Sequence, residues 1–174
     1  MHPCTALTPT QQRLLAVLLT ASVTVCYGFG LYLFPLLLSD MRLSLGFDYA
    51  AVGWITALSQ GGYMLGALLG AWLGQRLGEL RLVWWSLSVT CLSLIVLSQG
   101  HSLYSIAPAL VLCGVWASLV WVPMVTVVAR YFPPQHSGRL MGLLASGTHY
   151  GVFIDGLLVP WLLVRTEWPQ VWLS

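Results

Sequence analysis

Charge is what this sequence has least of. Only 7% of its 174 residues are charged, and it has no lysine, so all seven basic residues are arginines. An average soluble domain is about 25% charged, and so few charged side chains could not cover the surface of a soluble fold of this size. The arginines stand singly between hydrophobic blocks and form no basic patch. We therefore expect lipid as the solvent and no nucleic-acid partner.

The sequence also lacks the residue spacings that hold metals, cofactors or catalytic nucleophiles. Its four cysteines form neither a CxxC pair nor a zinc-type pattern. An HExxH motif, a GxSxG motif and a Walker loop are all missing. We expect no metal, no cofactor and no enzyme activity. A membrane-embedded enzyme that uses His136 or His149 with Asp155 stays open as an alternative.

Long apolar blocks are what the sequence has instead. Hydrophobic residues make up 58% of the chain and gather in blocks that match the roughly 20 residues a transmembrane helix needs. We predict an all-α membrane protein with one domain over 1–174 and about five transmembrane helices. The predicted spans are approximately 14–39, 50–74, 82–99, 104–129 and 140–164.

The arginines orient these predicted spans. Cytoplasmic loops carry an excess of basic residues, so the side with more arginines is expected to be cytoplasmic. The N-terminus and the second and fourth loops hold Arg13, Arg76, Arg81, Arg130 and Arg139, whereas the first and fifth loops hold Arg42 and Arg165. We therefore predict a cytoplasmic N-terminus and a C-terminus on the outer face.

Glycine recurs every four residues down the second predicted span. At about 3.6 residues per turn such positions form one stripe, which lets the backbone of another helix approach closely. The stripe comprises Gly62, Gly66, Gly70, Gly74 and Gly78. Gly147 and Gly151 have the same four-residue spacing in the fifth span, and Asp155 is the next position in that series. Tight packing within the chain explains these glycines; association with a second copy or a separate half through the stripe is the alternative.

Residues 71–81, Ala-Trp-Leu-Gly-Gln-Arg-Leu-Gly-Glu-Leu-Arg, resemble the loop motif between helices two and three of the major facilitator superfamily. Arg76 and Gly78 match that motif, whereas Gln75 replaces its aspartate and Glu79 replaces a basic residue. Residues 129–139 are similar to the family's loop between helices four and five, and residues 168–172 to the entry to helix six. Glycine-containing segments in three spans resemble a bacterial branch named after the YbfB and YjiJ proteins.

The resemblance covers essentially the whole chain and implies a partial six-helix half of a major facilitator fold, truncated at the start of helix six. It implies a fragment of a secondary active transporter of the bacterial inner membrane. Such a permease moves a small organic solute by alternating access, and a second transporter half would be its partner. Coupling to protons is a hypothesis, because Leu110 stands where proton-coupled members often have an arginine.

A cytoplasmic gate is a further implication of the resemblance. The matching residues are Gln75, Arg76, Gly78, Arg130 and Arg139. Because Gln75 cannot form the ion pair of the family's aspartate, we expect the gate to close differently or more weakly. A small non-transporting membrane subunit or scaffold, with the glycine stripes as docking faces, remains the main functional alternative.

Asp155 is the one acidic residue well inside an apolar block. A charge at mid-membrane costs at least about 2.5–3.5 kcal/mol, so such a residue usually faces a cavity or a partner. We predict a proton-coupling or substrate-contacting carboxylate, with a structural aspartate as the alternative. His149 is a second candidate in the same span, although six residues' separation does not stack it on Asp155. Polar and aromatic side chains elsewhere are candidate cavity liners: Tyr27, Tyr32, Gln60, Tyr63, Trp116 and Trp121.

Overall fold

Helices are the only regular elements in the described residues, which are 8–100, 102–166 and 168–172 of a computed structural model. The all-α fold is thus as the sequence predicted. In chain order the elements are α1 (Pro9–Val23), η1 (Thr24–Tyr32), α2 (Leu33–Leu45), α3 (Tyr49–Leu77), α4 (Glu79–Ser98), α5 (Leu103–Tyr131), η2 (Pro134–His136), α6 (Ser137–Leu163) and α7 (Trp168–Val171).

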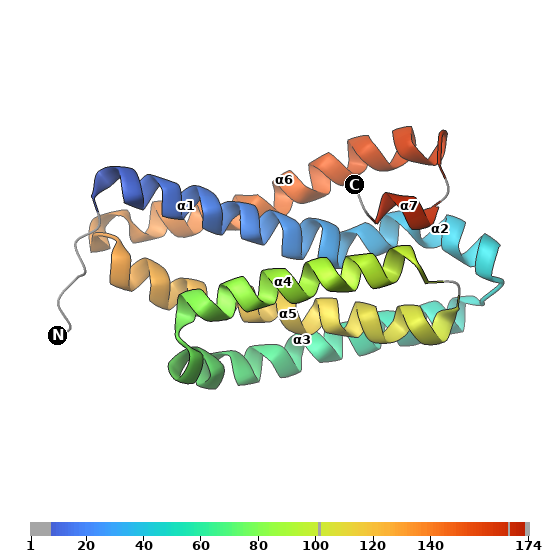
Figure 1. Ribbon diagram of the computed structural model, residues 1–174, viewed down its shortest axis with the longest axis horizontal. Helices are drawn as coiled ribbons and strands as arrows, with labels where there is room; N and C mark the ends of the chain where they lie inside the picture. Colours follow the sequence, from blue (N-terminus) through green and yellow to red (C-terminus); the bar gives the residue numbers. More distant parts are fainter. Residues whose placement is uncertain (1–7, 101, 167, 173–174) are drawn as a thin grey trace.

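The first predicted span is a rod formed by α1, η1 and α2 without a break (Figure 1). Thr8 caps its start, because the Thr8 hydroxyl accepts from the Gln11 amide and the Gln11 side chain accepts from the Thr8 amide. Gly46 ends the rod with φ 69°, a left-handed conformation that glycine adopts without strain. The middle piece, η1, is a nine-residue π-helix, which the sequence did not predict.

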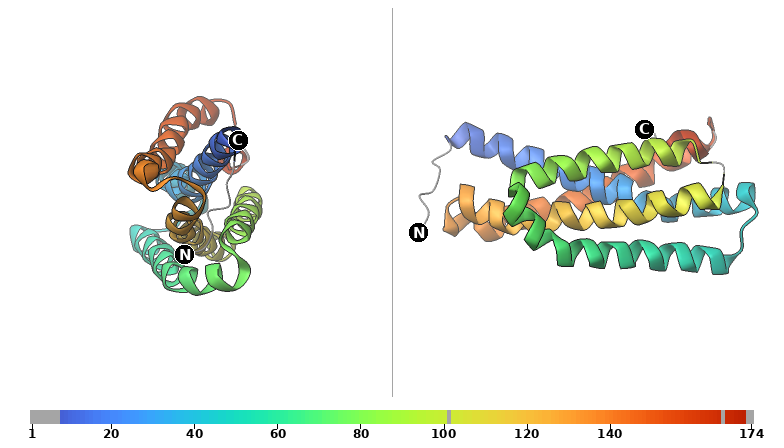
Figure 2. Two further views of the ribbon diagram at one scale, coloured as in Figure 1. Left: turned by 90° about the vertical axis from the view of Figure 1, so that its left-hand side faces the viewer. Right: turned by 60° about the horizontal axis from the view of Figure 1, so that its bottom comes forward.

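The long helices alternate in direction, as Figures 1 and 2 show. The start of α1, the turn between α3 and α4, and the turn between α5 and α6 therefore meet at one end. Gly78, with φ 86°, forms the tight turn between α3 and α4. We call this the basic end, because its elements carry Arg13, Arg76, Arg81, Arg130 and Arg139. The grouping of arginines that the orientation argument needed is present in the fold.

In the described part of the chain, four helical segments are long and apolar enough to cross a membrane: Pro9–Leu45, Glu79–Ser98, Leu103–Tyr131 and Pro134–Leu163. The remaining long helix, α3, has 29 residues, which is sufficient length. Its glycines and Gln60 are less hydropathic than leucine or valine, and α3 is not among the four. The five-span topology therefore stays a prediction as far as α3 is concerned. Most helix ends lie outside the bounds of the predicted spans, because helical structure continues into the residues that flank the apolar blocks.

The glycine stripe of α3 packs against α5, so its partner lies within the chain. A Cβ added to Gly62 would lie 2.8 Å from the Val111 carbonyl oxygen, and one at Gly70 would lie 3.0 Å from the Val122 Cβ. These contacts favour packing within the chain over association of a second copy through the stripe, because α5 covers the face at these glycines. Gly78 does not belong to the stripe, since it forms the turn. We call this contact the α3–α5 seam; it contains Gly62, Gly66, Gly70, Val111, Val115, Ser118 and Val122.

The glycines of α6 pack against the rod. A Cβ added to Gly151 would lie 2.6 Å from the Gly28 Cα, so the two backbones touch where α6 passes η1. The Thr24 hydroxyl donates a hydrogen bond across this contact to the Gly147 carbonyl oxygen at 3.0 Å. We call it the α6–rod seam; it contains Thr20, Thr24, Gly28, Gly147 and Gly151.

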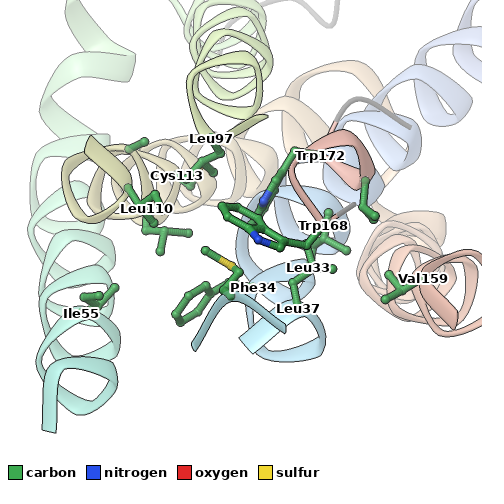
Figure 3. Close-up of a cluster of buried hydrophobic side chains, with 14 residues drawn as sticks. Leu33, Phe34, Leu37, Ile55, Leu97, Leu110, Cys113, Val159, Trp168 and Trp172 are labelled. Carbon is green, nitrogen blue, oxygen red and sulfur yellow. The ribbon is translucent and has the colours of Figure 1, made fainter. Parts of the chain in front are cut away.

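The segment that resembles an entry to helix six folds as the short helix α7. Trp168 and Trp172 are buried in an apolar cluster with side chains of α2, α4, α5 and α6 (Figure 3). The Trp168 indole donates a hydrogen bond to the Ser44 hydroxyl at 2.7 Å, which ties α7 to the end of the rod. A second cluster, toward the basic end, joins α1, η1, α4, α5 and α6.

Candidate functional site

Three of the predicted cavity liners meet at the middle of the helix bundle. Tyr27 of η1 and Tyr63 of α3 share a hydrogen bond between their hydroxyls at 3.0 Å. Their ring centroids lie 6.2 Å apart, and those of Tyr27 and Trp121 of α5 lie 6.3 Å apart, both edge to face. Tyr63 is the central residue of α3 (Tyr49–Leu77). We call these three residues the aromatic cluster.

Two further candidates, Tyr32 and Gln60, line a separate small cavity. Its volume is about 80 Å³, and Gly30, Phe34, Ser59 and Leu110 are also among its walls. A water molecule occupies about 30 Å³, whereas pockets for small organic ligands hold about 300–1,000 Å³. This cavity is therefore too small for an organic solute by itself. An organic solute would need walls beyond those that enclose this cavity.

Trp116 joins neither of these groups. Its indole nitrogen is buried and has no hydrogen-bond partner in the described part of the chain. A buried N–H group without a hydrogen-bond partner costs free energy, so a ligand, a water or a partner chain that accepts from the Trp116 indole would stabilise this position.

Asp155 is buried between α6 and the rod. Only 1% of its surface is exposed, and neither carboxyl oxygen has a hydrogen-bond partner among the described residues. It lies one turn beyond Gly151, whose backbone touches Gly28. An ionised carboxylate without a partner is costly in such surroundings, so Asp155 needs a proton or a partner group. His149 is exposed on another face of α6, so the structure does not bring these two candidates together.

An ion pair at the basic end joins the two loops that resembled family motifs. Arg130 Nη1 lies 3.0 Å from Glu79 Oε2, and both groups are partly open to solvent. Glu79 is the first residue of α4, where an acidic side chain also interacts favourably with the helix dipole. In the sequence, Glu79 stands out only as a departure from the motif. Its role was missed because nothing in the sequence indicated that it would face Arg130.

The other gate-motif residues occupy separate positions at this end. The Arg76 guanidinium lies over the Trp72 ring, 4.5 Å from its centroid. Gln75 lines a cavity of about 250 Å³ with Glu79, Pro123 and other residues of α3 and α5. Arg139 lies away from these groups, in a larger cavity with Arg13. The structure thus joins Glu79 to Arg130, places Gln75 at a cavity that Glu79 also lines, and leaves Arg76 and Arg139 apart.

The described ranges contain no group of three or more His, Cys, Asp or Glu side chains close enough to hold a metal ion.

Comparison with known proteins identifies a family whose sequence profile matches this chain. The sequence profile described as Major Facilitator Superfamily matches residues 20–174. Over 141 residues the chain is 26% identical to a probable galactarate/D-glucarate transporter, GudP, of Escherichia coli (strain K12), covering 76% of this chain and 31% of that protein.

Two further relatives are also named as transporters. The chain is 31% identical over 132 residues to probable anion transporter 6 of Oryza sativa subsp. japonica, covering 73% of this chain and 30% of that protein. It is 22% identical over 147 residues to a gallate transporter of Pseudomonas putida, with 84% and 33% covered. The chain therefore spans about a third of the length of these curated relatives.

Proposed function

This chain belongs to the Major Facilitator Superfamily, and from that membership we propose that it is part of a secondary transporter for a small organic solute in a bacterial inner membrane. Its helices form a partial major facilitator fold. The relatives named above are transporters, so a transport role is favoured over an enzyme. Alternating access around a site near the midplane is the mechanism that such two-part designs use.

The observation that carries this proposal is the aromatic cluster. Tyr27, Tyr63 and Trp121 come from three helices that are far apart in sequence, and they place two hydroxyls at the middle of an apolar bundle. Polar groups at that depth are expected where a solute or water passes. The cavity beside Tyr32 and Gln60 holds only about 80 Å³. We therefore propose that the solute lies between this helix bundle and a second transporter half.

The solutes to test first are small organic anions. Relatives are named for galactarate or D-glucarate, anions and gallate. All described arginines lie near the ends of the long helices, whereas the groups nearer mid-depth include hydroxyl, indole, amide and carboxyl groups and the His149 imidazole. We propose that any arginine that binds an anionic solute comes from the second half.

Asp155 is proposed as the proton-binding group of this bundle. Its burial and its two unpaired oxygens support that role, because such a group gains a partner or a proton when its surroundings change. His149 is exposed and lies away from Asp155, so a direct relay between them is not part of the proposal.

The gate at the basic end is proposed to close through the Glu79–Arg130 ion pair. Gln75 has no charge at the position of the family's aspartate, whereas Glu79, four residues later at the start of α4, carries one. The placement in the YbfB/YjiJ-like branch and the cytoplasmic N-terminus remain predictions. A non-transporting scaffold is less favoured, because α5 covers the glycine face that was its proposed docking surface.

Uptake measurements test the proposed solute site. In the full-length transporter that contains this chain, Tyr63→Phe removes one hydroxyl and keeps the ring. Loss of one hydrogen bond should raise the KM for solute roughly 2- to 10-fold. Tyr104→Phe is the matched control, because Tyr104 is 92% exposed at the far end of α5. Labelled galactarate, gallate and phosphate are the solutes to assay. Equal uptake kinetics in both variants would remove the aromatic cluster from the solute path.

A further inference from the structure

A cavity of about 620 Å³ at the basic end has no role in the proposed transport site. It is lined by Arg13 of α1, by Phe132 and His136 from the α5–α6 turn, and by Arg139, Leu140 and Leu143 of α6. None of these residues belongs to the aromatic cluster or to the cavity beside Tyr32. Its volume is in the range of small-molecule sites, about 300–1,000 Å³. In Figure 1 the start of α1 and the start of α6 lie together at this end.

The position of its walls is fixed by a contact between α1 and α5. The Gln12 side chain, next to Arg13, donates a hydrogen bond to the Tyr131 carbonyl oxygen at 3.3 Å. Phe132 follows Tyr131 and is buried, so it forms a fixed apolar part of the wall. The cavity is therefore built by three elements that are held together, and it does not depend on one surface side chain.

The cationic groups of this cavity have no acidic partner in the described ranges. Arg13 and Arg139 are exposed, and no ion pair or hydrogen bond joins them to another described group. Glu79 is the only acidic residue that the described chain places at the basic end, and it pairs with Arg130. The first turn of α6 holds no acidic residue, so its positive dipole end adds to the two arginines. The cavity has an excess of positive charge that an anion would balance.

The apolar walls decide which anion fits. Leu140 and Leu143 follow Arg139 by one and four residues on α6, so apolar surface begins directly beside the guanidinium group. A small soluble anion would leave this surface in water, whereas a phospholipid would cover it with its acyl chains. Arginine binds phosphate oxygens through parallel hydrogen bonds, and basic pockets on the cytoplasmic side of membrane helices hold anionic lipid head groups. We propose that this cavity binds an anionic phospholipid, with the phosphate at Arg13 and Arg139 and an acyl chain along Leu140 and Leu143.

Lipid titration of the purified chain tests this site independently of any transport activity. Phosphatidylglycerol or phosphatidylcholine is added to the chain in detergent, and bound lipid is counted by native mass spectrometry. We expect clear preference for phosphatidylglycerol. Replacing both Arg13→Gln and Arg139→Gln should weaken its binding roughly 30-fold, which is about 5-fold for each arginine near the membrane surface. Both arginines are exposed, so helical content by circular dichroism should stay unchanged.

Arginines at the opposite end supply the matched control. Arg42 and Arg165 each lie over an aromatic ring at that end, so Arg42→Gln with Arg165→Gln removes the same charge elsewhere. This control pair should keep the lipid preference. A control pair that loses it equally would show that total charge matters and not the cavity, which would overturn the proposal. A folded Arg13→Gln, Arg139→Gln variant that keeps full preference would also overturn it.

Competition with inorganic phosphate separates a lipid site from a site for soluble anions. A lipid site should keep phosphatidylglycerol bound at millimolar phosphate, and Leu143→Asn should weaken the lipid several-fold. Leu143 is 45% exposed, so this change should leave the fold intact. Displacement of the lipid by phosphate, with no effect of Leu143→Asn, would identify a soluble-anion site and reject the lipid.

Discussion

The α3–α5 seam and the α6–rod seam both use glycines spaced by four residues, yet they differ in what lies beside the glycines. The α3–α5 seam joins two α-helices, and the backbone of Val111 and Val115, the Ser118 hydroxyl and valine side chains of α5 lie over the stripe. The α6–rod seam presses glycine against glycine at a π-helix, and its next position in the series is the unpaired Asp155. The same sequence pattern thus serves as a plain packing surface in one place and borders a buried acid in the other.

The largest difference between the seams should appear in transport when their buried polar residues are replaced. We expect Asp155→Asn to reduce pH-gradient-driven uptake by the full-length transporter to background, because the amide keeps the shape but cannot bind a proton. Ser118→Ala in the α3–α5 seam is the control; Ser118 is fully buried and bonds only within its own helix. It should retain uptake, with insertion checked by membrane fractionation for both variants. Unchanged uptake with Asp155→Asn would exclude the residue from coupling.

The second largest effect should come from adding one methyl group to the α6–rod seam. In Gly151→Ala the Cβ would meet the backbone of Gly28 at 2.6 Å, and backbone cannot move aside without shifting a helix. We expect a loss of about 1–3 kcal/mol in stability, the usual range for overpacking. Gly156→Ala is the control on the same helix, since no atom lies within 4 Å of its added Cβ. Thermal unfolding in detergent measures both, and equal melting temperatures would contradict the close contact.

A smaller effect is expected from the same change at the edge of the α3–α5 seam. In Gly70→Ala the new Cβ would lie 3.0 Å from the Val122 Cβ, a milder overlap than at Gly151, which a small shift between the two helices would relieve. We expect a loss below about 1.5 kcal/mol, less than for Gly151→Ala. Gly61→Ala on α3 has open space and serves as the reference. If Gly70→Ala unfolds the chain as readily as Gly151→Ala, the two seams are equally rigid and the contrast drawn above is wrong.

The smallest effect should come from the ion pair outside both seams. Partly exposed pairs contribute about 0–1 kcal/mol, so Glu79→Gln should lower stability by no more than that. A double-mutant cycle with Arg130→Gln isolates the pair, and its coupling should fall as salt concentration rises. Coupling that is zero at low salt would show that the pair contributes nothing to closing this end.

Several features of the fold could be predicted from the sequence because they depend on local pattern. Apolar blocks gave the helices, the uneven distribution of arginines gave the basic end, and glycine spacing gave close packing in both seams. Helix rotation and tertiary contact could not be predicted. The meeting of Tyr27, Tyr63 and Trp121 depends on how three helices turn about their own axes, and the Glu79–Arg130 pair depends on two loops meeting.

The π-helix was not predicted because nothing in the residues of η1 distinguishes them from a regular membrane helix. Gly28 and Gly30 lie in this segment, but glycine occurs in many regular membrane helices. The packing of Gly28 in η1 against Gly151 in α6 is a contact between segments far apart in the chain, which the sequence did not indicate. Similarly, the sequence did not indicate that α5 would cover the stripe of α3, because several of the predicted helices contain glycine and any of them could have been the partner.

The nine residues of η1 couple the length of the rod to rotation of α2 about the rod axis. Hydrogen bonds from residue i to i+5 wind more residues into each turn than the i to i+4 bonds of an α-helix. Rewinding η1 as an α-helix would lengthen the rod and rotate α2 about its axis while α1 stayed in place. Leu37 and Met41 of α2, which are fully buried, would then leave their positions in the apolar cluster around α7. Translation and rotation of α2 are thus linked through one segment, and that segment is the part of the rod against which Gly151 packs at Gly28.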